Sequence, residues 1–116
     1  MKILTKHQLA QLLKNGREAA KSDDFDPYPV VKLFTPDADC TWLLAWLEPG
    51  DTDLAYGLCD LGVGCPELGT VRLSELVATR GKLGLPIERD LTWTATNPLH
   101  DYARLSLTRR LLVDTL

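Results

Sequence analysis

Two histidines and a cysteine are the side chains best suited to acid–base or nucleophilic chemistry in this sequence. His100 precedes Asp101 at the start of a predicted helix, and an imidazole beside a carboxylate is a common acid–base pair. His7 falls in the first turn of another predicted helix, where polar side chains usually contact solvent. Cys65 has no Lys, Arg or His beside it to favour the reactive thiolate. We therefore predict no catalytic residue and interpret Cys65 as inert.

Three consecutive charged residues follow a glycine-rich segment. Glu88, Arg89 and Asp90 end the segment 81–90, whose glycines and proline predict a loop. Charges placed there could orient a ligand, so a small enzyme or ligand-binding domain that uses 81–90 with His100 is one alternative. The simpler interpretation is a surface ion pair, which stabilises little. No Lys-Ser/Thr pair follows the glycines, so the segment is not a phosphate-binding loop.

The middle of the chain carries an excess of acidic residues. Residues 23–67 contain ten Asp or Glu and a single lysine, whereas the whole chain has a net charge of −3. Such a surface either keeps the protein soluble or imitates nucleic-acid phosphate and binds a basic groove on a partner. Seven of the acids fall in predicted loops and are expected to share one rim of the sheet: Asp23, Asp24, Asp26, Asp37, Asp39, Asp51 and Asp53.

Spacing argues against a metal site. The paired aspartates lack the glycine and the closing glutamate of a calcium loop. The three cysteines, Cys40, Cys59 and Cys65, lack the spacing of zinc ligands. We expect no metal and no cofactor.

Basic residues near both ends of the chain leave a DNA-binding regulator as another alternative. They would form a contiguous stripe if the first and last helices packed side by side. The residues are Lys2, Lys6, Lys14, Arg17, Arg104, Arg109 and Arg110.

An apolar run from Cys40 to Leu47 predicts the central strand of a sheet. In an extended strand, alternate side chains point to opposite faces, and here neither face is polar. We therefore expect helices to cover both faces. One face would receive Cys40, Trp42, Leu44 and Trp46, and the other Thr41, Leu43, Ala45 and Leu47.

Further strands and two helices follow from local patterns. Thr5 and Gln8 form a capping box at the start of the first helix, and Asn15-Gly16 offers its end. Ser74 is placed to cap a short helix at 75–80. Short connections between the first strands imply antiparallel pairing. The strands are predicted at 30–34, 53–60, 68–73 and, by strict alternation, 90–96.

The C-terminal segment has the pattern of a long amphipathic helix. Asn97-Pro98 is a strong helix start, and apolar residues then follow one helical face over 98–116. That face either covers the sheet or leaves a strip for a partner, including a second copy of the chain. The predicted class is α+β: a mostly antiparallel sheet of about five strands with an N-terminal helix, a short middle helix and a long C-terminal helix.

Size and composition predict one cytoplasmic domain over residues 1–116. The length is typical of a single domain. No apolar run nears the roughly 20 residues of a membrane-spanning helix. The N-terminus lacks the apolar core of a secretory signal, and three cysteines that cannot all pair fit a reducing compartment.

Five segments carry a pattern shared with a known family. They are PVVKLFTP at 29–36, TW at 41–42, ELG at 67–69, LSEL at 73–76 and, most specific, RGKLGLPIERDL at 80–91. In these segments the chain resembles the small bacterial family called domain of unknown function 2958. The resemblance covers about 3–100, and the segment 98–116 extends beyond it. Members are typically encoded on plasmids, integrative elements and phages, often near conjugation or anti-restriction genes, and no activity is established for them.

Together these observations lead us to expect a non-enzymatic interaction protein of a mobile genetic element. Its acidic rim would bind a protein with a basic surface, such as a host defence complex that handles nucleic acid, of the CRISPR or restriction type. Direct nucleic-acid binding and membrane insertion are not expected. The enzyme or ligand-binding alternative and the DNA-binding alternative remain open.

Overall fold

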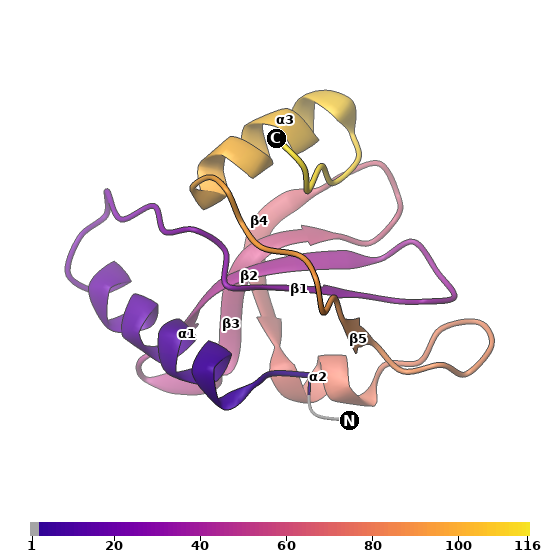
Figure 1. Ribbon diagram of the computed structural model, residues 1–116, viewed down its shortest axis with the longest axis horizontal. Coiled ribbons are helices and arrows are strands. Elements are labelled where there is room, and N and C mark those ends of the chain that lie inside the picture. Colours follow the sequence, from indigo (N-terminus) through magenta and orange to yellow (C-terminus); the bar gives the residue numbers. More distant parts are fainter. Residues whose placement is uncertain (1–2) are drawn as a thin grey trace.

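In the computed structural model, which describes residues 3–116, five antiparallel strands form one sheet in the order β4-β3-β2-β1-β5 (Figure 1). The strands are β1 (Val31–Phe34), β2 (Thr41–Glu48), β3 (Asp51–Asp60), β4 (Glu67–Arg72) and β5 (Glu88–Arg89). The helices are α1 (Lys6–Ala19), α2 (Leu73–Ala78) and α3 (Leu99–Arg109). The predicted α+β class is therefore confirmed.

β2 is the central strand and is buried on both faces, as its apolar sequence predicted. Trp42 and Leu44 enter the core that α1 covers, together with Leu12 of that helix. Leu43 and Ala45 enter a second core, which α3 covers. The first and last helices, α1 and α3, thus lie on opposite faces of the sheet.

A β-bulge in β2 reverses the faces of the last residues of the strand. Leu44 and Trp46 pair with adjacent residues of β3, so Ala45 is an extra residue on β2. Trp46 therefore packs with the α3 core, and Leu47 joins the α1 core. The predicted faces of these two side chains were wrong, because a strand that is apolar on both faces gives no signal of its register.

α1 begins as predicted and ends later. The Thr5 hydroxyl accepts from the Gln8 N–H, and the Gln8 side chain accepts from the Thr5 N–H, each at 3.0 Å. The helix does not stop at Asn15-Gly16, and both residues are buried inside it. A Cβ on Gly16 would lie 1.8 Å from the Leu47 carbonyl oxygen, so this glycine permits close packing on β2.

The predicted strand 90–96 is absent, because Asp90 turns the chain away from β1. Its carboxylate accepts from the N–H groups of Thr92 and Trp93, both at 2.9 Å. Such a side-chain turn competes with strand pairing. The segment after β5 therefore leaves the sheet edge and crosses towards α3 (Figure 1).

α2 lies two residues before its predicted position, and Ser74 does not cap it. The cap comes instead from Asp53 at the start of β3, whose carboxylate accepts from the Ser74 N–H at 3.0 Å. This partner is distant in sequence, so the local pattern could not place the helix start.

The predicted helix 98–116 was too long. α3 ends at Arg109, and Arg110 takes a left-handed backbone conformation with φ 56°. The following tail folds back because two side chains bind its backbone: Asp60 accepts from the Leu112 N–H at 2.9 Å and Ser106 from the Val113 N–H at 2.8 Å. We call residues 111–116 the tail.

Candidate functional site

A groove of about 720 Å³ lies beside the segment that leads into β1. α1 forms one wall, the segment 27–30 forms the floor, and the segment 89–95 forms the other wall. It exists because Asp90 turns the chain out of the sheet, which leaves space between that segment and α1. We call this hollow the edge groove.

The edge groove is lined by amides and aromatic rings. Tyr28 and Trp93 supply the rings, and Arg89 supplies a cation. The amide of Asn15 is committed to the fold, because it donates to the Ala45 carbonyl at 2.9 Å and so satisfies the extra residue of the bulge. A groove lined by aromatic rings and a few polar groups suits a small ligand or an extended peptide.

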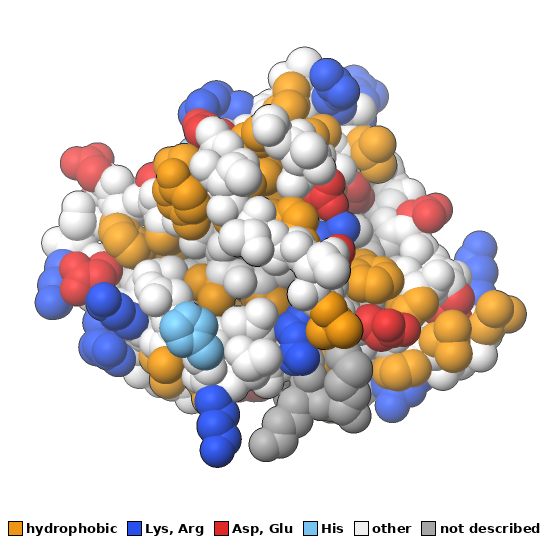
Figure 2. All heavy atoms as spheres, viewed as in Figure 1, with side chains coloured by type: hydrophobic (Ala, Val, Ile, Leu, Met, Phe, Trp, Pro, Cys, Tyr) orange, Lys and Arg blue, Asp and Glu red, His pale blue; other side chains and the backbone are white. Residues whose placement is uncertain are grey.

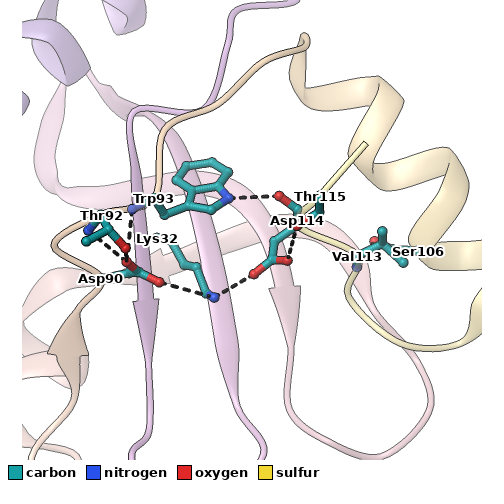
Figure 3. Close-up of polar contacts among 8 residues, drawn as sticks. All are labelled: Lys32, Asp90, Thr92, Trp93, Ser106, Val113, Asp114 and Thr115. Carbon is teal, nitrogen blue, oxygen red and sulfur yellow. Dashed lines mark hydrogen bonds and ion pairs between the residues drawn. The ribbon is translucent and has the colours of Figure 1, made fainter.

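A three-residue charge cluster lies next to the edge groove (Figure 3). The Lys32 ammonium from β1 lies between two carboxylates, 2.5 Å from Asp114 Oδ2 and 3.4 Å from Asp90 Oδ2. Only 18% of the Lys32 side chain is exposed. The cluster therefore ties three distant parts of the chain together at the sheet edge.

Electrostatics within the cluster favour its ionised form. Burial by itself lowers the pKa of Lys32, but hydrogen bonds and charge from Asp114 and Asp90 outweigh it and leave the pKa raised. The hydrogen bond from the Thr92 N–H is the main cause of the lowered pKa of Asp90, with smaller contributions from Trp93 and Lys32. An ammonium held in this way is a structural cation rather than a base.

The predicted charged trio separates into different roles. Glu88 and Arg89 form β5, the short edge strand that pairs with β1. Arg89 also lines the edge groove, and Asp90 builds the charge cluster. His100, at the start of α3, does not line the groove. Its Nδ1 lies 3.4 Å from Asp26 instead. The set proposed for an enzyme does not converge.

The acidic loops do not gather on one rim. Asp37 and Asp39 lie in the β1–β2 connection, whereas Asp51 and Asp53 lie at the β2–β3 turn, at the opposite end of β2. Figure 2 shows acidic side chains at both sides of the molecule. The expected common rim is therefore wrong.

Most of these carboxylates hold the fold together. Asp51 lies 2.9 Å from the Arg72 guanidinium. The Ser74 hydroxyl is the main cause of the lowered pKa of Asp53. Asp26 accepts from the His100 N–H at 3.0 Å and so caps α3. Asp23 and Asp24 are exposed in the loop after α1.

Asp37 anchors the glycine-rich loop that precedes β5. Its Oδ2 accepts from the Leu83 N–H at 2.6 Å, and a Cβ on Gly81 would collide with Oδ1 at 1.6 Å. Oδ1 is buried and is the only such side-chain atom without a hydrogen-bond partner in the described part of the chain. Gly81 is therefore needed for the carboxylate to enter the loop.

The basic residues of the first and last helices do not form one stripe. The sheet separates the two helices, since α1 covers one core and α3 the other. The Arg104 side chain is paired with Asp101. Lys2 lies outside the described residues. The side-by-side packing that a DNA-binding surface required is therefore not present.

The cysteines have different environments. Cys59 is partly buried on β3, and this burial raises the pKa of its thiol to about 11. Cys40 is also partly buried, and Cys65 is exposed in the β3–β4 connection. The thiol of Cys59 is therefore held in its unreactive protonated form.

Large apolar side chains are exposed on α2, in the loop before β5 and at Leu91, just after β5. Leu83 is 80% exposed and Leu91 is 79% exposed, with Leu85 and Val77 of α2 also exposed. Figure 2 shows apolar side chains gathered over this loop and β5. We call Val77, Leu83, Leu85 and Leu91 the leucine surface.

Neither metal clusters nor membrane spans occur along 3–116. The His, Cys, Asp and Glu side chains there form no group of three or more that could hold a metal ion. None of the helices described combines the length and apolar character needed to cross a bilayer.

Sequence reasoning missed the tail and the lysine that holds it. Lys32 and Asp114 are 82 residues apart, so no spacing rule joins them. Trp93 was noted only as an alternating apolar residue, whereas its indole N–H donates to the Asp114 carbonyl at 2.8 Å. The one available signal was Lys32, the single cation of the acidic middle segment.

Comparison with known proteins yields one match. The family model described as protein of unknown function (DUF2958) matches residues 3–111. The match includes α3, so it runs beyond the position near 100 where the resemblance was expected to end. No curated protein and no solved structure matches the chain.

Proposed function

Because the chain belongs to the DUF2958 family, which is described only as being of unknown function, we propose a role from its structure: it binds a protein partner and performs no catalysis. The leucine surface carries this proposal. Single exposed leucines are ordinary on soluble proteins, but exposed large apolar side chains on α2, on the loop before β5 and just after β5 mark an interaction surface. A partner would bury Leu83 and Leu91, which the chain itself leaves in solvent.

The roles of the polar side chains support the non-enzymatic part of the proposal. Asp37 and Asp53 bind backbone N–H groups of other segments, and Asp90 binds those of the turn that follows it. Among the described residues, no hydroxyl or thiol is hydrogen-bonded to a histidine. A nucleophile paired with a base is the usual arrangement for covalent catalysis.

Capture of the partner from cells of the native host tests the proposal. The tagged wild-type chain and the double variant Leu83→Ser/Leu91→Ser are used as bait, and bound proteins are identified by mass spectrometry. Val63→Ser serves as a control, because Val63 is 74% exposed on a different loop. A partner retained by the wild type and by Val63→Ser but lost with the double variant supports the proposal. Equal capture by all three baits contradicts it.

The narrower form of the proposal concerns the partner's identity. We infer a cytoplasmic role on a mobile element, with a host defence complex of the anti-CRISPR or anti-restriction type as target. What supports it is the acid excess of 23–67 and the genetic context that the family resemblance implies. Asp23, Asp24 and Asp39 remain exposed to attract a basic surface. Binding that weakens steeply as ionic strength rises is expected, and salt-independent binding would rule out this form.

The edge groove favours a second candidate function, the binding of a small polar ligand. The observation behind it is a hollow of about 720 Å³ with Tyr28, Trp93 and Arg89 in its lining. Screening small anions and amides by NMR is expected to shift the Trp93 indole resonance, and the shift should be lost in Arg89→Met. Resonances that stay in place across the screen would remove this candidate.

A further inference from the structure

The tail is held like a bound peptide. Side chains of the folded domain bind its backbone, since Asp60 accepts from the Leu112 N–H, Ser106 accepts from the Val113 N–H and the Trp93 indole donates to the Asp114 carbonyl (Figure 3 shows the last two). These contacts read main-chain atoms and so do not depend on the tail's own side chains. They are the contacts by which a groove holds an extended peptide.

One further contact selects an acidic residue. Lys32 lies 2.5 Å from the Asp114 carboxylate and is largely buried beside Asp90. Asp114 is the nearer of the two carboxylates around this cation, so an acid at this tail position makes a charge-assisted hydrogen bond that a neutral side chain cannot equal. The Leu112 side chain packs against the core that α3 covers, so the site selects an apolar residue and, two positions later, an acid, here Leu112 and Asp114.

The tail does not fill the available space. A depression of about 410 Å³ borders residues 110–112, and another of about 390 Å³ borders residues 114–116; Lys32 lines both. The two depressions therefore lie beside the tail, one before and one after Val113 along the chain, with Lys32 in the lining of each. We call the tail site with its two depressions the tail trough. A longer extended peptide would occupy more of it than the tail does.

The tail is also poised to leave. It contains no helix or strand, and its departure from α3 requires the left-handed Arg110, the only non-glycine residue with positive φ in the described chain. Left-handed backbone is unfavourable for a residue with a Cβ. Residues 110–116 contain no glycine or proline, and their apolar residues continue the helical pattern of α3. A straight continuation of α3 therefore competes with the folded-back form.

We propose that the tail trough is a peptide-binding site for a partner protein and that the tail is its built-in competitor. The partner supplies an extended segment with an apolar residue and, two positions later, Asp or Glu. This inference rests on the proposed protein-binding function and adds a second, separate contact to the leucine surface. Because the tail is tethered, it competes at a high effective concentration, and the trough opens to a partner only when the tail is released.

Fluorescence anisotropy with full-length variants tests the proposal. The probe is a labelled synthetic peptide with the sequence of residues 110–116, RLLVDTL, which in the chain itself occupies the trough. The wild type should bind it weakly. Asp114→Asn should bind it about tenfold more tightly, because its own tail loses a charged hydrogen bond while the probe keeps it. Asp24→Asn makes the same charge change on a distant loop and should leave the affinity unchanged.

Three further measurements sharpen the test. A probe with Asn in place of its acid should lose the tenfold gain, and Lys32→Met combined with Asp114→Asn should no longer distinguish the two probes. Arg110→Gly removes the cost of the left-handed conformation, favours the folded-back tail and should weaken probe binding several-fold.

The overturning results are equally specific. Asp114→Asn that is folded by circular dichroism yet binds the probe no better than the wild type contradicts the proposal, as do equal affinities for the Asp and Asn probes. Self-association of the wild type in the concentration range where the probe binds would assign the trough to a second copy and overturn the partner assignment. Equal capture by the wild type and the leucine-surface variant, which would contradict the proposed function, would leave these results unchanged, so the two proposals fail separately.

Discussion

The two faces of the sheet are held together by different means. On one face, α1 approaches β2 so closely that Gly16 contacts the Leu47 carbonyl and the Asn15 amide satisfies the bulge at Ala45. On the other face, α3 covers an apolar core. The tail that follows α3 is held at the edge of the domain by hydrogen bonds from side chains, with Lys32 at the centre. The contact of α1 with β2 is close packing against a buried backbone, whereas the contact of the tail with the domain consists of polar bonds near solvent.

This difference suggests that the α1 face stabilises the fold and that the α3 edge carries the function. Close packing is cooperative and costly to disturb, so the α1 face is expected to move only when the whole protein unfolds. A few polar bonds near solvent break locally at much lower cost. The α3 edge is therefore the part of the molecule able to exchange one set of contacts for another, and the four predictions below test that contrast.

The largest effect is expected at Gly16. Alanine normally favours a helix over glycine by about 1 kcal/mol, yet here Gly16→Ala should destabilise by about 3 kcal/mol because its Cβ collides with the backbone of a buried strand. Urea unfolding measures the change in free energy. Lys14→Ala, an exposed substitution in the same helix, should have almost no effect. Equal stability of Gly16→Ala and the wild type would mean that α1 packs less closely than described.

The next effect is expected at Asn15. Asn15→Leu has a similar size but leaves the Ala45 carbonyl buried without a donor, which should cost about 1–3 kcal/mol. The loss should be global, so circular dichroism and Trp fluorescence should report the same unfolding midpoint. A fully stable variant would show that the bulge carbonyl has another donor.

A smaller and local effect is expected at Lys32. Lys32→Met removes the cation between two carboxylates and should cost about 1–2 kcal/mol, chiefly in the attachment of the tail. Limited proteolysis should then cleave within 110–116 while the core stays intact. Asp24→Asn provides a control, since that exposed loop has no contact with the tail trough. Cleavage spread along the chain would contradict a local role.

The smallest effect is a pH dependence at Asp90. Its pKa in the folded protein is lowered, so it contributes stability above the ordinary aspartate pKa of about 3.9 and loses it as pH falls through the folded value. The stability difference between the wild type and Asp90→Asn should therefore shrink below about pH 4. Urea unfolding between about pH 3 and pH 7 measures it. A constant difference across that range would mean that Asp90 is not held ionised by its turn.

The fold was predictable where the signals are local. The capping box of Thr5 and Gln8 lies within one helical turn, and the apolar composition of β2 requires burial on both faces. The bulge was not predictable, because shifting the register of an all-apolar strand exposes no polar side chain. Nor was the end of α3, since no glycine marks Arg110 and the bonds that fold the tail back come from distant Asp60 and from within the helix.

The candidate sites were predictable only in part. Asp90 attracted attention as one of three consecutive charges, but its partner Asp114 was hidden in what the periodicity indicated to be a helix. The acids of the turns were assigned to one surface because sequence shows their number and not their partners. Arg72, Ser74 and the N–H of Leu83 engage them from segments more than twenty residues away.

Hydrogen exchange at the amides of Leu112 and Val113, measured by NMR against those of β2, tests the central contrast most directly. The contrast predicts that the two tail amides exchange by local opening, far faster than the β2 amides, and that Asp114→Asn accelerates the tail amides alone. Tail amides that exchange only as fast as the β2 amides, by global unfolding, would show that the tail is a fixed part of the fold and not an exchangeable occupant.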